Sequence, residues 1–391
     1  MAFAAGVGMM HAQTDTLPSK MKDMNWRVGM SLGGDAVVPT NAYLKGEYPG
    51  GKMIGAAFGV HLQGDFSYNP KSLTGRLYKG LYQGIGVDVR TFYNPGKLGT
   101  PVSLYVYQGM PFAWLTPKVT LGYEWQFGAA MGWQHIYNPV TSPYNTAVST
   151  RITAHMNVGI KVNYQFDKHW QFNCGWSVMH YSNANTRQPN QGINMTGVTM
   201  GVSYTHDEWK EPEGATREMI EENLQDRRLY VDILTYTGQR KKVKFNKGGH
   251  DQDNVYEGSF NVSGIRVGPM WKCNRFVAVG GQLDFRYDES AGVEPIGQYA
   301  RGEIITNYTC PSSAFKQMSL GVMGCAELTM PLFAVNVALG VNALRPDGEK
   351  IFYQALSVKL SPHPRFYINA GYQLSDFKLP QNLCLGVGIR I

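Results

Sequence analysis

Apolar and polar residues alternate along most of this chain in segments of roughly ten residues, separated by stretches rich in turn-forming residues. Alternation with a period of two places the apolar side chains on one face of a β-strand and the polar ones on the other. Before residue 206 this pattern predicts eight strands, at 25–34, 53–66, 82–92, 101–110, 117–132, 151–165, 168–181 and 193–205. After residue 228 it predicts eight more, at 229–243, 257–269, 275–288, 315–328, 332–342, 351–361, 364–374 and 382–391.

The composition decides which kind of β-protein this pattern describes. The chain of 391 residues holds 45 glycines and 12% aromatic residues but only 17% charged residues, whereas soluble domains carry about a quarter. No apolar run approaches the ~18 residues that a spanning helix needs. We therefore predict an all-β fold, a transmembrane antiparallel β-barrel of about 16 strands in two eight-strand repeats, closing as two small barrels or as one larger barrel. A soluble β-sandwich or barrel is the alternative.

Charge and hydrophobicity divide the chain into four parts. Residues 1–23 resemble the end of a secretory signal or form a disordered tail, and we exclude them from the fold. Residues 24–205 form the first repeat of strands. Residues 206–228 form a charged linker whose pattern is compatible with a helix from Ala215, and residues 229–391 form the second repeat.

The two repeats share a pair of charges. Asp88 and Arg90 in the first repeat are answered by Asp284 and Arg286 in the second. Each acid and base lie on the strand face opposite the apolar one, so they should point into a barrel, where charge is tolerated only when it is paired. We interpret both pairs as structural, with a proton relay or a pore as the alternative.

Cofactor and nucleic-acid sites have no clear pattern in this sequence. The five cysteines form no Cys-x-x-Cys pair, and the scattered histidines show no metal-ligand spacing, so we predict no metal site and no cofactor. The net charge of +7 favours attraction to an anionic surface such as phosphorylated lipid. Nothing in the sequence indicates nucleic-acid binding.

A histidine and a serine stand two residues apart in VMHYSNANTRQPNQGIN, residues 178–194. By parity, His180 and Ser182 share the apolar strand face with Trp176, so they should point outward to lipid at the outer end of the strand. Asn194 lies on the corresponding face of the next strand. Nucleophilic catalysis needs a hydroxyl, a base, a group that holds the imidazole and donors for an oxyanion. A hairpin joining these three side chains could supply the first three parts.

The loop between these two strands supplies candidates for the remaining part. The side chains of Asn183, Asn185 and Asn190 and the backbone amides around Gly192 are candidate donors to an oxyanion. Arg187 in the same loop could meet a lipid phosphate. A site at the outer lipid interface implies that the substrate is itself a lipid.

The motif H-x-S-N-A followed by P-N-x-G, on the last hairpin of an eight-strand set, resembles the PagL family of outer-membrane lipid A 3-O-deacylases and related acyloxyacyl hydrolase-like proteins. The resemblance covers about residues 24–205. It implies that Ser182 is the nucleophile and His180 the general base. It also implies that Asn190 and backbone amides near Asn185 stabilise the oxyanion, without a cofactor.

Asn194 departs from the family, which has an acid at this position; an amide can orient the imidazole but cannot stabilise imidazolium by charge. The prediction is a serine esterase that removes an ester-linked acyl chain from lipid A of lipopolysaccharide, in the outer membrane of a Gram-negative bacterium. The alternative is a non-catalytic outer-membrane barrel, a pore or a lipid-binding scaffold, with a degenerate site. Asp376 and Lys378 match His180 and Ser182 in the second repeat, so no second site is predicted, and the oligomeric state stays open.

Overall fold

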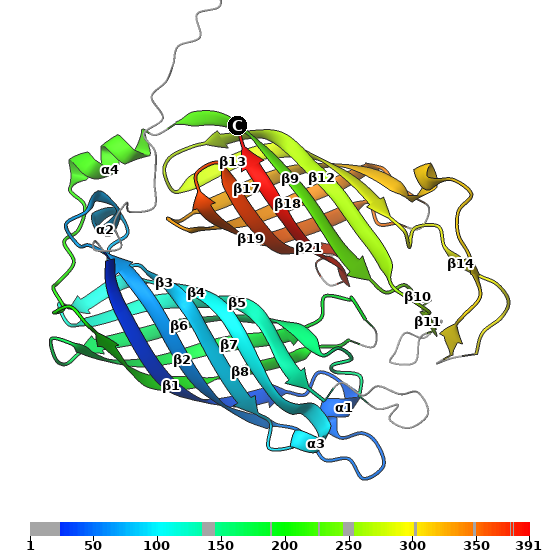
Figure 1. The fold of residues 1–391 in the computed structure, drawn as a ribbon, viewed down its shortest axis with the longest axis horizontal. Coiled ribbons are helices and arrows are strands. Elements are labelled where there is room, and N and C mark those ends of the chain that lie inside the picture. The colour runs from blue at the N-terminus through cyan, green and yellow to red at the C-terminus, as the bar shows by residue number, and fades with distance from the viewer. Residues whose placement is uncertain are drawn as a thin grey trace, which may run out of the picture.

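The computed structural model of the protein contains two closed antiparallel β-barrels, which Figure 1 shows next to each other. The structure describes residues 24–134, 145–187, 190–225, 227–244, 254–300, 303–346, 349–375, 377 and 379–391. The signal-like segment 1–23, Asp376 and Lys378 lie outside these described residues.

The first barrel follows the chain without a crossover, because each strand pairs with the next and the eighth pairs back with the first. Its strands are β1 (Met24–Val38), β2 (Ala56–Tyr68), β3 (Tyr82–Thr91), β4 (Gly99–Thr116), β5 (Val119–Trp133), β6 (Ile152–Gln165), β7 (Trp170–Ser182) and β8 (Ile193–Thr205). A barrel of eight strands has an interior just wide enough for its own side chains.

The second barrel repeats this arrangement and closes through the pairing of its last strand with its first. Its strands are β9 (Arg228–Arg240), β12 (Phe260–Lys272), β13 (Val277–Asp288), β17 (Met318–Thr329), β18 (Phe333–Leu344), β19 (Phe352–His363), β20 (Phe366–Ser375) and β21 (Leu379–Arg390). The predicted all-β barrel fold is confirmed, and the choice left open by the sequence is decided in favour of two barrels.

Short elements occupy the loops between the long strands. They are α1 (Ala42–Lys45), α2 (Leu73–Leu77), α3 (Pro95–Leu98), α4 (Arg217–Leu224), the 3₁₀ helix η2 (Ala314–Gln317), β10 (Val243–Lys244), β11 (Asn254–Tyr256), β14 (Glu294–Pro295), β15 (Ile304–Ile305) and β16 (Tyr308–Thr309). Helix α4 lies in the charged linker and begins after Thr216, whose hydroxyl caps the helix by accepting from the N–H of Met219 at 3.3 Å. None of the helices in the described ranges is long and apolar enough to cross a membrane.

The alternation along each strand separates an apolar outer face from a polar interior. On β7, Trp170 and Trp176 point outward and are 42% and 50% exposed, while Asn173 and Tyr181 point inward and are buried. The outward apolar face and the inward polar face match the arrangement expected of a barrel that lies in lipid.

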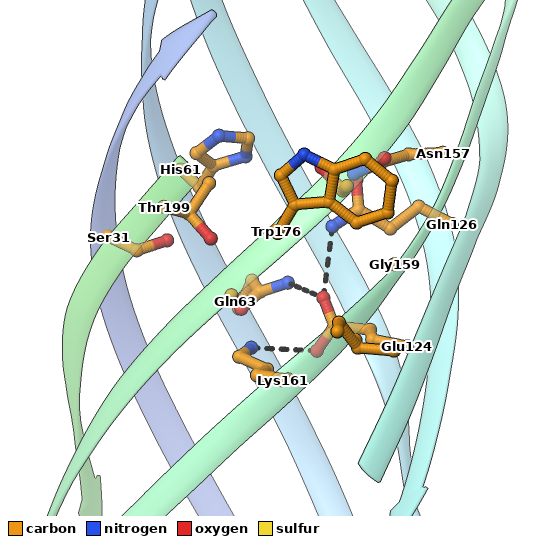
Figure 2. Close-up of a pocket in the computed structure, with 13 residues that line it drawn as sticks. Ser31, His61, Gln63, Glu124, Gln126, Asn157, Gly159, Lys161, Trp176 and Thr199 are labelled. Atoms are coloured by element: carbon orange, nitrogen blue, oxygen red, sulfur yellow. Dashed lines mark hydrogen bonds and ion pairs between the residues drawn. The ribbon is translucent and has the colours of Figure 1, made fainter. Parts of the chain in front are cut away.

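The interior of the first barrel is filled by paired charges. Glu124 accepts a hydrogen bond from the ammonium of Lys161 at 2.7 Å, and Figure 2 shows further amide donors around the same carboxylate. The predicted pair is also present, because Arg90 Nε donates to Asp88 Oδ2 at 3.0 Å, and Arg90 pairs in addition with Asp35. Pairing offsets the cost of removing these charges from water.

In the second barrel the corresponding residues have different partners. Arg286 pairs with Glu349, which comes from the loop between β18 and β19. Asp284 accepts a hydrogen bond from the hydroxyl of Tyr236 at 2.7 Å and lies 3.4 Å from Nε of Arg266. Asp284 and Arg286 are therefore both buried and paired inside the barrel as expected, but each pairs with a side chain from another strand or loop and not with the other.

The two barrels run in the same direction and contact each other. In Figure 1, α1 and α3 of the first barrel lie at the same end as β10, β11 and β14 of the second, and we call this the outer end. Aromatic pairs join the two walls: the ring centroids of Tyr78 and Phe276, and those of Trp125 and Phe333, are 5.2 Å apart. Loops from both barrels also meet at the outer end, where the N–H of Lys241 donates to the carbonyl oxygen of Asn185 at 2.9 Å.

Candidate active site

The register of β7 with β8 places His180 opposite Asn194. Both side chains point out of the barrel, and His180 Nδ1 lies 2.7 Å from Asn194 Oδ1. Because an amide oxygen can only accept, Nδ1 carries the proton, and Nε2 keeps the lone pair that a general base needs. The amide thus fixes the tautomer and the orientation of the imidazole.

Ser182 is the last residue of β7 and lies on the same face as His180, only 6% exposed. Its Oγ accepts from Asn190 Nδ2 at 3.0 Å and from the backbone N–H of Ala184 at 3.2 Å. The amide oxygen of Asn190 accepts from the N–H of Asn183 at 3.3 Å, which directs Nδ2 toward the serine. Among the hydrogen bonds of the described residues, none joins Ser182 to His180.

The turn after Ser182 has a strained backbone. Ala184 and Asn185 have φ values of 55° and 66°, in the left-handed region. Asparagine tolerates this region, whereas alanine is found there only where its surroundings hold it. Asn183 holds the turn, since its Nδ2 donates to the carbonyl oxygen of Arg187 at 2.9 Å. The strained turn directs the N–H of Ala184 at the serine hydroxyl.

The sequence predicts that the backbone amides around Gly192 donate to an oxyanion, but in the structure these amides have other partners. The N–H of Gly192 donates to the carbonyl oxygen of Ala147 at 3.1 Å, and the N–H of Gln191 donates to that of Thr146 at 2.9 Å. These amides are engaged within the protein, so an oxyanion role does not fit them. Gly192 has φ of 70°, and a Cβ atom there would lie 2.9 Å from His180 Cε1, so the glycine lets the backbone pass over the imidazole.

The other predicted substrate-binding residues lie around the turn. The side chain of Asn183 supports the backbone, so a direct contact with substrate does not fit it. The carbonyl oxygen of Asn185 accepts from the N–H of Lys241, a residue of the second barrel. Arg187 is exposed at the outer end.

Residues outside the hairpin also contact the candidate site, and no sequence pattern identifies them as site residues. Ser149, between β5 and β6, donates to the carbonyl oxygen of Arg187 at 3.3 Å. Asn41 caps α1 and donates through Nδ2 to the carbonyl oxygen of Gly192 at 3.4 Å. These residues and Lys241 reach the hairpin only through tertiary contacts, which a local pattern does not record.

The outer wall beside the site is apolar. On β6, Ala154 stands in register with Ser182, and Ile152 and Val158 are each 58% exposed. No group of three metal-binding side chains occurs among the residues that the structure describes. A hydroxyl, a neutral imidazole with a free lone pair and two N–H donors, next to an apolar wall, are the parts that acyl transfer from a lipid requires.

Two family models match this chain, one in each barrel. Residues 56–203 match the family model described as lipid A 3-O-deacylase (PagL), and residues 230–391 match that of the acyloxyacyl hydrolase C-terminal domain. A comparison with curated proteins finds no match.

The chain also has distant similarity to solved structures, including a Neisserial surface protein and a siderophore receptor. Neisserial surface protein A is 11% identical, with 46% of this chain and 96% of that chain covered and a TM-score of 0.29. The siderophore receptor PirA from Pseudomonas aeruginosa is 8% identical, with 94% and 80% covered and a TM-score of 0.24.

The two family models extend the similarity beyond the hairpin that first suggested it. The first includes His180, Ser182 and Asn194, and the second covers the strands of the second barrel. Together they span most of the chain and confirm the resemblance seen in the sequence. The chain therefore belongs to the PagL family of lipid A 3-O-deacylases.

Proposed function

We propose that the protein is a serine esterase that removes an ester-linked acyl chain from lipid A with Ser182 as the nucleophile. His180 is the general base, and Asn194 orients it. The observation that carries the proposal is the contact of 2.7 Å between His180 Nδ1 and Asn194 Oδ1, next to a serine whose hydroxyl already faces two N–H donors. Family membership supplies the lipid A deacylation, and the residue roles are our assignment.

The first half of the reaction forms an acyl-serine. Ser182 Oγ attacks the carbonyl carbon of the ester while its proton passes to Nε2 of His180. The N–H of Ala184 and Nδ2 of Asn190, which bind the resting hydroxyl, then face the oxyanion of the tetrahedral intermediate. The ester C–O bond breaks, and the proton on Nε2 passes to the departing sugar oxygen, which becomes a hydroxyl.

The second half releases the fatty acid. Water attacks the acyl carbon, gives its proton to Nε2 of His180, and the proton returns to Ser182 Oγ as the C–O bond to serine breaks. The serine must turn toward the imidazole when substrate binds, as catalytic hydrogen bonds often shorten only in the complex.

The outward direction of the site supports lipopolysaccharide in the outer membrane of a Gram-negative bacterium as the setting. Ser182 lies at the outer end of β7, among the exposed apolar side chains of β6 and β7. At this depth the acyl chains of a lipid contact the wall while its ester groups lie level with the strand ends.

Mass spectrometry of lipid A tests the proposal. Cells carrying the wild type should produce lipid A that lacks one ester-linked chain, and Ser182→Ala should restore the full set because the nucleophile is gone. Ser177→Ala, on the same strand but the opposite face, is the matched control and should behave as wild type. Identical lipid A in cells with the wild type and with Ser182→Ala would refute the assignment.

Asn194 favours a second candidate function, a lipid-binding scaffold without turnover. An amide leaves the imidazolium without a countercharge, which lowers the rate of serine attack. A scaffold would bind lipid A but leave its acylation unchanged in both the wild type and Ser182→Ala, so the same measurement separates the two candidates.

A further inference from the structure

The outer end of the second barrel reaches the turn that carries a candidate oxyanion donor. Lys241 directly follows β9, and its backbone N–H donates to the carbonyl oxygen of Asn185 at 2.9 Å. Asn185 is adjacent to Ala184, whose own N–H donates to Ser182. A hydrogen bond from the second barrel therefore restrains the same turn that aims this donor.

The side chain of Lys241 brings a positive charge to the same place. Among the described residues its ammonium donates to the carbonyl oxygen of Gly258, which leaves two of its three N–H bonds for a ligand. Burial and the positive charge of Arg187 lower the pKa of Lys241, against a smaller opposite effect of Glu257. The backbone bond to Asn185 brings Lys241 to within two residues of Arg187 along the turn. The two positive charges repel each other, and an anion bound to both relieves the repulsion.

We propose that the second barrel completes the active site: Lys241 holds the turn at Asn185 through its backbone and, together with Arg187, binds a phosphate of the lipid headgroup. The inference rests on the proposed function, because the phosphate belongs to the same substrate. A guanidinium and an ammonium are the groups that bind phosphate most strongly in proteins. Lys241 lies between β9 and β10, and Arg187 lies in the loop between β7 and β8, so both belong to loops at the end of the strands where Ser182 also lies. The headgroup of a lipid whose ester reaches Ser182 would extend toward these loops.

The backbone and the side chain of Lys241 have separable effects. The N–H acts on the geometry of the turn, so its loss lowers kcat for every lipid substrate. The ammonium acts on the headgroup, so its loss raises KM for a phosphorylated lipid. In the first role Lys241 is a positioning residue, and in the second it binds substrate.

Lys241→Ala tests the side chain, because alanine keeps the backbone N–H. The full-length variant is assayed on lipid A that carries its phosphates and on the same lipid after their removal. KM for the phosphorylated lipid should rise about tenfold, which lowers the preference for it by the same factor, and Arg187→Ala should act alike. Lys241→Arg should retain the preference. Lys316→Ala, an exposed lysine of η2 in the same barrel, is the matched control.

Lys241→Pro tests the backbone, because proline has no N–H to donate. In addition to the KM effect of the alanine variant, kcat should fall about tenfold on both lipids. Heat-modifiable migration shows whether the variant folds. Hydrogen exchange in the wild type gives a second measurement that needs no variant: the amide of Lys241 should exchange slowly, and fast exchange contradicts the backbone role.

Inorganic phosphate separates the headgroup from the free anion. It should inhibit hydrolysis of the phosphorylated lipid by the wild type and lose this effect in Lys241→Ala. Inhibition that is equal in both proteins assigns phosphate to another site and overturns the inference, as does an unchanged preference in Lys241→Ala and Arg187→Ala. A wild type that hydrolyses neither lipid instead refutes the proposed function, so the two failures differ in outcome.

Discussion

In the proposed mechanism, Asn194 orients His180 but brings no charge to the imidazolium that forms when serine loses its proton. Asn194→Asp should therefore raise kcat for lipid A by about tenfold or more, because the carboxylate keeps the hydrogen bond to Nδ1 and adds a countercharge. Asn194→Ala should lower kcat, since it removes the orienting group. Steady-state hydrolysis of purified lipid A checks both. An aspartate variant no faster than the wild type would show that proton transfer to His180 does not limit the rate.

Gly192 is a second position at which a small substitution should change the geometry of the candidate site. Its φ is 70°, and an added Cβ would lie 2.8 Å from the carbonyl oxygen of Tyr181 and 2.9 Å from His180 Cε1, so Gly192→Ala should displace both the turn and the imidazole and lower kcat by about 10². Gly34→Ala is the matched control, because a Cβ at that position on β1 meets nothing within 4 Å. Equal loss of activity in both variants would point to a general effect on folding.

At the scale of the element, β7 ties the site to the interior of the barrel. His180 points outward, while its neighbour Tyr181 points inward and donates through its hydroxyl to Asp88 at 3.2 Å. Tyr181→Phe keeps the ring and removes this bond, so it should lower the free energy of unfolding by about 1 kcal/mol. Thermal unfolding in detergent measures the change, with Tyr164→Phe on the exposed outer face as the control. An unchanged midpoint would mean that Asp88 does not need this donor.

The strands and their faces could be predicted from the sequence because alternation is a local property. The directions of His180 and Ser182 follow from parity along β7. Strand ends were predicted less accurately near proline, which usually interrupts a strand. The predicted strand 101–110 ends before Pro111, whereas β4 runs from Gly99 to Thr116. It accommodates Pro101 and Pro111 at irregularities in its pairing with β5.

The interactions that finish the site could not be predicted in this way. The N–H of Ala184 reaches Ser182 only because the turn adopts positive φ, and an alanine gives no hint of that conformation. Ser149 and Lys241 approach the hairpin from other loops, one of them in the other barrel. Such contacts depend on how the barrels close and pack, and not on the order of residues in the hairpin.

At the scale of the whole molecule, both barrels are filled by their own side chains. Lys161 and Glu124, on the adjacent strands β6 and β5, pair inside the first barrel, and in the second Lys359 donates to Asp232 at 3.0 Å and to Glu327 at 2.7 Å. We therefore expect no stable conductance steps from the protein in planar bilayers, with a wide porin as the positive control. Steady single-channel steps would contradict a packed interior and favour the pore alternative.

With Ser182 as the proposed nucleophile, the reaction takes place on the outward face of the barrel wall, so substrate and enzyme would meet by lateral diffusion within one sheet of lipid. Hydrolysis by this route is confined to the leaflet in contact with the outer end of the barrels and to the membrane that holds the protein. The released fatty acid and the remaining lipid both stay in that leaflet, so each turnover changes the local mixture in which the next substrate must be found. The reaction thereby changes the lipid composition of the membrane that surrounds the protein.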